Sequence, residues 1–193
     1  PSLYQIGGVA NETIVPLING GLIRPLDDLV AKYGQNLQPN QLIKVDGKIM
    51  AIAMMVNTQH LMYREDVLTE LGLAVPTTWD EVLTAAEAIK ASGKVETPLG
   101  ATMKAGWNLA QEFVNMYLGA GNPLVGADGT PSVNNENGVR TLEMMKALTA
   151  YMDPEYLTSD STFVQQQFQQ GKIAMANLWA SRGGAMDDPA ESQ

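Results

Sequence analysis

Amide, indole and guanidinium side chains stand at the expected ends of strands and helices, where they could bind a polyhydroxylated molecule. Asn57 directly follows a long apolar run, and Trp107 comes just before a predicted helix. A flat indole packs on the C–H face of a sugar ring, and amide and guanidinium groups hydrogen-bond to its hydroxyls. The candidates on this basis are Asn57, Trp107, Asn108, Asn177, Trp179 and Arg182. An alternative stays open, because Trp107 and Trp179 could each be core residues.

The residues that usually carry catalysis are absent or badly spaced. There is no glycine-rich phosphate loop, nucleophile elbow or H-E-x-x-H motif. Cysteine is absent and His60 is the one histidine, which disfavours a zinc site and a Ser-His-Asp triad. The acidic pairs are adjacent in sequence, so their members point to different faces and are interpreted as solvated surface. We therefore expect no catalytic residue, no metal and no cofactor.

Composition and charge exclude several other classes. With 45% hydrophobic and 17% charged residues, the 193-residue chain is typical of a folded protein. The net charge of −9 would repel phosphate backbones, so we expect no binding to nucleic acid. No apolar run reaches the roughly 18 residues of a membrane span. Direct membrane insertion is therefore not expected.

The elements that must position the candidates alternate between short strands and helices. Strands are predicted at 3–6, 48–56, 61–63 and 173–175, and the second is apolar enough to be buried on both faces. Asp46-Gly47 is a turn signal before that strand. Asn177 and Trp179 then follow the last strand. This pattern predicts an α/β fold with helices in excess.

Seven helices are predicted, and the clearest begins at Trp79. Thr78 and Glu81 have the spacing of a capping box, and apolar residues follow Trp79 at helical intervals, so Trp79 is interpreted as a packing residue. A later helix presents Val139, Leu142, Met145 and Leu148 at the same spacing. The other predicted helices cover 11–18, 26–33, 64–71, a segment marked by Leu109 to Tyr117, and 162–170.

Five segments, in order, resemble the extracellular solute-binding proteins of ABC importers, in the sugar-type group that includes maltose-binding protein. These segments are Gly21–Asp28 (GLIRPLDD), Val45–Ile52 (VDGKIMAI), Leu61–Asp66 (LMYRED), Leu71–Glu81 (LGLAVPTTWDE) and Phe168–Met175 (FQQGKIAM). The chain departs from the pattern at Ala53, where the family usually has proline. The chain is also about half the length of a family member, so the resemblance implies a fragment.

The resemblance implies a two-lobed, periplasmic-binding-protein-like α/β fold of type II, represented incompletely. Residues 1–57 would be part of the first lobe with a crossover, and residues 58–193 the second lobe. By the same resemblance, Asn57 lies at the crossover, while Trp107 and Trp179 fall where the family has aromatic platforms. Asn108, Asn177 and Arg182 are their neighbours. Asn11 would face the cleft from the first lobe.

The function that the resemblance implies is capture of a sugar or polyol by cleft closure, for import through ABC permease membrane subunits. The protein would then be periplasmic or extracellular, with its signal peptide absent from this chain, and would not be an enzyme. Two alternatives stay open. One is a carbohydrate-active α/β enzyme domain that uses Asp/Glu chemistry. The other is a protein-interaction module whose aromatic residues dock a partner.

Overall fold

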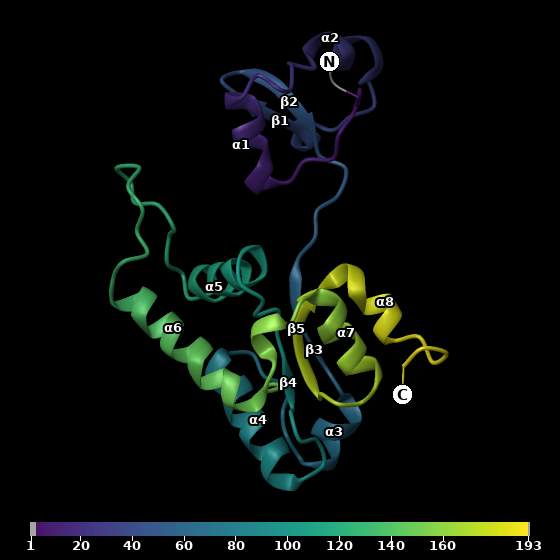
Figure 1. Cartoon of the computed structure of the whole chain (residues 1–193), viewed down its shortest axis with the longest axis vertical. Coiled ribbons are helices and arrows are strands. Elements are labelled where there is room, and N and C mark those ends of the chain that lie inside the picture. The colour runs from purple at the N-terminus through teal and green to yellow at the C-terminus, as the bar shows by residue number, and fades with distance from the viewer. Residues whose placement is uncertain (1–2, 193) are drawn as a thin grey trace. The chain divides into compact units, whose positions relative to one another are not determined.

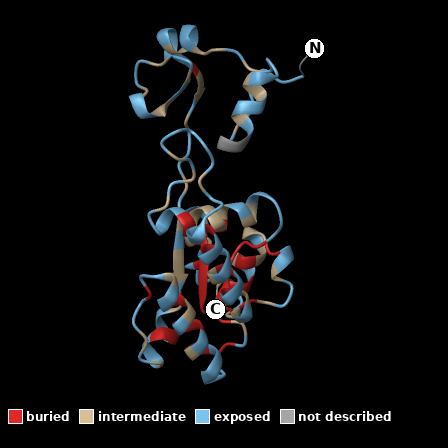
Figure 2. Cartoon of the chain, turned by 90° about the vertical axis from the view of Figure 1, so that its left-hand side faces the viewer, coloured by how far each residue is buried: buried red, intermediate tan, exposed pale blue. Residues whose placement is uncertain are grey.

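The computed structural model describes residues 3–192, without the side chains of residues 11 and 12. The polypeptide divides into two compact units, Pro1–Val56 (unit 1) and Asn57–Gln193 (unit 2), whose elements are labelled in Figure 1. The division falls one residue before the lobe boundary expected from the sequence. Figure 2 shows that the buried residues concentrate in unit 2.

Unit 1 contains two helices and a two-stranded antiparallel hairpin. Asp46 and Gly47 connect the two strands with φ values of 49° and 76°, as the turn signal predicts. The elements are α1 (Asn11–Asn19), α2 (Asp27–Tyr33), the 3-10 turn η1 (Pro39–Gln41), β1 (Leu42–Val45) and β2 (Lys48–Ile52).

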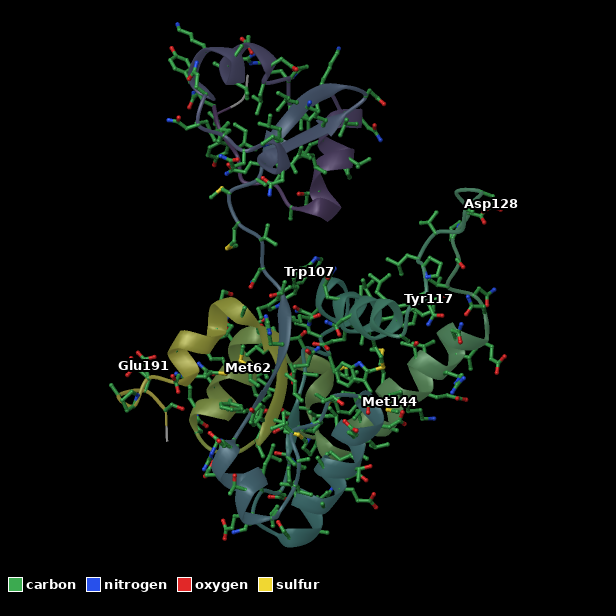
Figure 3. All side chains as sticks on the ribbon, turned by 180° about the vertical axis from the view of Figure 1, so that it is seen from behind. Met62, Trp107, Tyr117, Asp128, Met144 and Glu191 are labelled. Atoms are coloured by element: carbon green, nitrogen blue, oxygen red, sulfur yellow. The ribbon has the colours of Figure 1, made fainter. Side chains whose placement is uncertain are left out.

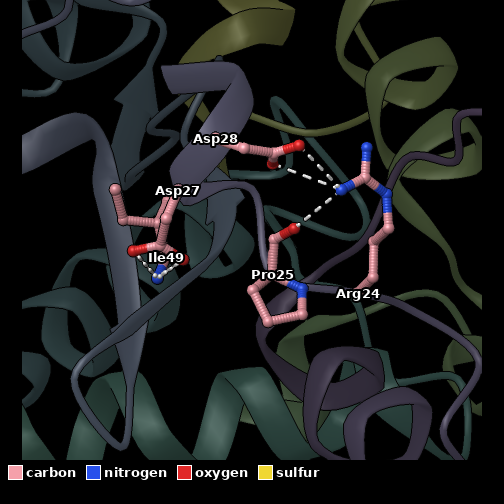
Figure 4. Close-up of polar contacts among 5 residues, drawn as sticks. All are labelled: Arg24, Pro25, Asp27, Asp28 and Ile49. Atoms are coloured by element: carbon pink, nitrogen blue, oxygen red, sulfur yellow. Dashed lines mark hydrogen bonds and ion pairs between the residues drawn. The ribbon is translucent and has the colours of Figure 1, made fainter. Parts of the chain in front are cut away.

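The first two family-like segments contact each other in unit 1 (Figure 4). The backbone N–H of Leu26 donates to the carbonyl of Ile49 over 2.7 Å. The N–H of Ile49 in turn points at the Asp27 carboxylate, 3.3 Å from the nearer oxygen. Arg24 reaches Asp28 at 3.2 Å, although both side chains are largely exposed. The bonds of Leu26 and Asp27 to Ile49 dock the beginning of α2 onto β2.

Two strand predictions in unit 1 are wrong. The apolar run 48–56 was expected to be one strand buried on both faces, but β2 ends at Ile52, and Met54 and Val56 are 92% and 87% exposed. Among the described strands β2 pairs with β1 alone, and a two-stranded ribbon cannot bury both faces. The expected strand at 3–6 does not form either, since Leu3 and Ile6 are 84% and 92% exposed and no described strand pairs with them.

Unit 2 is built around a three-stranded sheet in the order β3-β5-β4, with β3 antiparallel and β4 parallel to β5. Short 3-10 turns also occur at η2 (Thr149–Tyr151), η3 (Tyr156–Thr158) and η4 (Ala180–Arg182). The elements in chain order are β3 (Gln59–Tyr63), α3 (Glu65–Glu70), α4 (Trp79–Ser92), β4 (Leu99–Gly100), α5 (Trp107–Gly119), α6 (Glu136–Leu148), α7 (Ser161–Gln169), β5 (Met175–Trp179) and α8 (Gly183–Met186).

Helices cover both faces of this sheet because β5 is apolar on both sides. Met175 packs into a cluster with side chains of α3, α4, α5 and α6. Ala176 and Leu178 pack into a second cluster with side chains of α7 and α8. The residues Met175 to Leu178 are all 3% exposed or less. A central strand flanked by helices on both sides is the architecture that the α/β pattern predicts.

The last strand is longer than predicted and begins later. It was expected at 173–175, but the ladder runs from Met175, opposite Tyr63, to Trp179, opposite Gln59. Asn177 therefore lies inside the strand and not after it. A polar residue after an apolar run typically marks the end of a strand, but the Asn177 amide donates to the buried Glu112 and stays inside the strand.

The core face of α6 also differs from the prediction. Met145 and Leu148 are buried as expected, but Val139 and Leu142 are 54% and 57% exposed. The helix instead turns Gly138 inward, where an added Cβ would lie 2.0 Å from the carbonyl oxygen of Val133. Because glycine lets α6 approach the preceding segment closely, the buried face of the helix includes Gly138 and leaves Val139 and Leu142 exposed.

The predicted capping box at α4 is confirmed and yields a stability prediction. The Thr78 hydroxyl accepts from the Glu81 N–H at 3.2 Å, and Glu81 accepts from the Thr78 N–H at 3.1 Å. Replacing Thr78 with alanine should lower the free energy of unfolding by about 1 kcal/mol in urea denaturation. Thr84→Ala is the matched control, since Thr84 is exposed within the same helix and caps nothing. Equal stability of both variants would contradict the role of the cap.

Candidate functional site

Two of the three tryptophans stack on each other in unit 2. The ring centroids of Trp107 and Trp179 lie 5.4 Å apart with 20° between the ring planes, and we call this pair the tryptophan stack. Trp107 is 44% exposed, whereas Trp179 is partly buried against the cluster that contains Ala176 and Leu178. At that spacing the rings are in direct contact, which leaves no room for a sugar ring between them. The stack therefore offers the exposed surface of Trp107, with Trp179 behind it.

The stack is formed where a helix begins and a strand ends. Trp107, labelled in Figure 3, is the first residue of α5, and Trp179 is the last residue of β5. Gly106 precedes the helix with a φ of 101°, a conformation that favours glycine. The third tryptophan, Trp79, is partly buried against the main core, as its position in α4 predicts.

Polar groups close to the end of β5 include two of the predicted residues. The amide of Asn57 donates to the Ser181 hydroxyl at 3.0 Å and accepts from the Ser181 N–H at 3.3 Å. These bonds extend the pairing of β3 and β5 by two residues, through the bond from the Ala180 N–H to the Thr58 carbonyl. Asn108 follows Trp107 in α5 and is half-buried. Sequence reasoning did not anticipate Ser181.

Two other predicted residues are bonded to side chains of unit 2. Asn177 is 3% exposed and its amide donates to the buried Glu112 carboxylate at 2.5 Å, so it is engaged inside unit 2. Arg182 donates to Gln165 of α7 at 2.9 Å, which ties η4 to that helix. Both side chains therefore have partners within unit 2. The side chain of Asn11 lies outside the described residues.

Glu112 is the buried acid that sequence reasoning missed. It is 3% exposed, and its carboxylate accepts hydrogen bonds from the Thr102 N–H at 2.9 Å, the Thr102 hydroxyl at 2.7 Å and the Gln59 amide at 3.3 Å, besides Asn177. A signal was present in the sequence. Glu112 occupies the i+3 position from Leu109 within the apolar pattern of α5, where a surface glutamate would not stand.

Burial raises the pKa of the Glu112 carboxyl, and the hydrogen bonds from Thr102, Asn177 and Gln59 partly oppose that rise. Because the pKa is higher in the folded than in the unfolded state, the folded state binds the proton more tightly between the two values. The free energy of unfolding therefore decreases as pH rises through that interval, starting near the ordinary value of 4.5.

This pKa shift predicts a pH-dependent difference between the wild type and Glu112→Gln. A glutamine keeps an acceptor and cannot ionise, so the stability of the wild type relative to this variant should fall as pH rises above about 4.5. Urea denaturation of both proteins across this range measures the difference, in which the contributions of the other titrating groups cancel. Parallel profiles would show that Glu112 titrates alike in the folded and unfolded states.

Among the side chains that the structure describes, acidic and histidine residues form no group of three that could hold a metal ion. No helix in the described part of the chain combines the length and hydrophobicity needed to span a bilayer.

Comparison with known proteins places the chain in a family. Residues 3–193 match the family described as bacterial extracellular solute-binding proteins. The chain is 39% identical over 66 residues to the multiple sugar-binding protein of Streptococcus mutans, covering 34% of this chain and 15% of that protein. It is 25% identical over 200 residues to the polygalacturonan/rhamnogalacturonan-binding protein of Bacillus subtilis, covering 91% of this chain and 38% of that protein.

The structural comparison agrees with the sequence comparison. An ABC transporter solute-binding protein of Agrobacterium radiobacter, solved in complex with ribitol, superposes with a TM-score of 0.80 and 25% identity. The match covers 92% of this chain and 47% of that one, so the chain spans less than half the length of these relatives. The expected fold class, a two-lobed solute-binding fold represented in part, is confirmed. The chain belongs to the family of bacterial extracellular solute-binding proteins.

Proposed function

We propose that the protein carrying this chain captures a sugar or polyol and delivers it to the membrane subunits of an ABC importer. The observation that carries the proposal is the tryptophan stack, whose exposed member is a ready surface for the C–H face of a sugar. The names of the sugar-binding relatives and of the ribitol complex support this ligand class. The family supports a periplasmic or extracellular location.

We propose that the contact set consists of Trp107 with the polar groups that border the stack. The indole of Trp107 supplies apolar contact, while the amides of Asn57 and Asn108 and the hydroxyl of Ser181 hydrogen-bond to ligand hydroxyls. Asn57 and Ser181 already satisfy each other, which holds both groups in fixed orientations. Fixed polar groups beside a flat apolar surface lose little conformational entropy when the ligand binds.

Isothermal titration calorimetry of the full-length protein tests the ligand class. The panel is ribitol, D-mannitol and maltose, with L-leucine and L-arginine as solutes that lack a polyhydroxyl chain. We expect saturable binding of at least one polyol or sugar and no heat of binding from the amino acids. Binding of the amino acids alone, or of no member of the panel, would overturn the proposal.

We propose that the protein binds without catalysis. Glycoside hydrolysis needs two carboxyl groups on opposite sides of the scissile bond. Among the described residues Glu112 is the one buried Asp or Glu, and its four hydrogen bonds lie within the protein. A bound disaccharide should therefore be recovered unchanged after long incubation with the protein, as chromatography would show. Release of monosaccharide would favour the enzyme alternative.

A further inference from the structure

The Glu112 carboxylate connects three segments of unit 2 to α5. It receives Gln59 from β3, Thr102 from the segment after β4, and Asn177 from β5. Every partner is a neutral donor, and the described residues place no cation against the carboxylate. Burying a carboxylate costs free energy, because its charge is removed from water. An apolar side chain at this position would fill the same space without that penalty.

The same segments carry the tryptophan stack. Gln59 lies directly opposite Trp179 in the β3–β5 register, and Asn177 precedes Trp179 by two residues in the same strand. Trp107 begins the helix to which Glu112 belongs, about 1.4 turns earlier. The carboxylate therefore bonds the strand end that carries one indole to the helix that carries the other.

Other contacts of α5 leave its position along the sheet loosely specified. The N-cap of the helix is Gly106, which has no side chain to cap the first turn. Its residues in the main core cluster, Leu109, Phe113 and Met116, are apolar. The buried Tyr117 does make hydrogen bonds, but its hydroxyl donates to the Ser132 carbonyl and accepts from Asn135, in the segment before α6 and not in the sheet. Apolar contacts are not directional, whereas hydrogen bonds to a carboxylate fix distance and angle.

We propose that Glu112 is the positioning residue that holds α5 in register with β5 and thereby sets the geometry of the tryptophan stack. It does not contact ligand; it acts through Gln59 and Asn177 on one side and through the helix on the other. The inference rests on the proposed function only for the statement that the stack is the ligand contact.

The exciton-coupled circular dichroism of the indole pair measures this geometry in the ligand-free, full-length protein. The signal is a couplet, a pair of bands of opposite sign that depends on the distance and orientation of the two rings. Trp107→Phe removes one indole and defines the signal, with Trp79 as constant background. Glu112→Leu should fold cooperatively, keep its helical signal and lose most of the couplet. Glu112→Gln should keep most of the couplet. If the Asn177 amide flips, its oxygen accepts from the new glutamine N–H, while the glutamine oxygen still accepts from Thr102 and Gln59. Thr141→Val, a buried polar change in α6, should lower stability and leave the couplet unchanged.

The outcomes separate positioning from general destabilisation. A folded Glu112→Leu protein with an intact couplet would overturn the proposal, as would a loss of equal size in Thr141→Val. If Glu112→Leu fails to fold, Gln59→Leu is the milder variant, because Thr102 and Asn177 still donate hydrogen bonds to the carboxylate. Gln59→Leu should lose part of the couplet. An unchanged couplet in this variant would contradict the inference. Loss of the couplet in a protein whose wild type binds no sugar would refute the proposed function and leave the positioning role standing.

Discussion

Alanine at position 107 should weaken sugar or polyol binding by the full-length protein at least about tenfold. Truncating a central aromatic anchor commonly costs about 2 kcal/mol or more of binding free energy, because both the contact and the exclusion of water are lost. Trp107 is the exposed member of the tryptophan stack, so the loss falls on the surface that we assign to the ligand. Isothermal titration calorimetry with the tightest ligand of the panel measures the change in dissociation constant.

The matched control is the tryptophan that packs in the core. Trp79 is partly buried against the main cluster of unit 2, so Trp79→Ala should lower the melting temperature and leave the affinity of the folded protein unchanged. Trp179→Ala should weaken binding as well, because Trp107 then loses the ring behind it. Affinities equal to wild type in both stack variants would refute the assignment.

Gly138→Ala should be strongly destabilising. A Cβ at this position would lie 2.0 Å from the backbone carbonyl oxygen of Val133, so the beginning of α6 or the preceding segment must move. Overpacking of this kind typically costs about 1–3 kcal/mol of unfolding free energy, and a backbone neighbour cannot turn aside as a side chain can. Urea denaturation measures the loss.

Gly119→Ala provides the comparison at another helical glycine. Nothing lies within 4 Å of a Cβ at Gly119, at the end of α5. Alanine has the higher helix propensity, so this variant should gain up to about 1 kcal/mol. If Gly138→Ala is as stable as Gly119→Ala, the close approach of α6 to Val133 does not exist in solution.

Local signals predicted most of the helices because their determinants lie within a few residues. Thr78 and Glu81 predict the beginning of α4, and Asp46-Gly47 predicts the β1–β2 hairpin. Strand limits depend on partners far along the chain. The run 48–56 has the composition of a buried strand, but burial needs neighbours, and β2 pairs with β1 alone among the described strands. The extent of β5 was likewise set by its pairing with β3, which no local pattern shows.

The candidate site was predictable in its aromatic part and not in its polar part. Trp107 and Trp179 stood out by type and by position at element ends, and the structure brings them together. Asn177 has the same appearance in sequence, but it lies inside β5 because Glu112 satisfies its amide. That pairing spans 65 residues. Sequence spacing cannot show which of two similar amides has a buried partner.

The central claim is that Trp107, and not Trp79, meets the ligand. The most direct measurement is the shift of the indole N–H resonances in two-dimensional ¹H–¹⁵N spectra during titration of the full-length protein with its tightest sugar or polyol. Single-tryptophan substitutions assign the resonances. We predict that the Trp107 indole shifts most, that Trp179 follows through the stack, and that Trp79 does not move. A saturating ligand that shifts Trp79 or neither member of the stack would contradict the account.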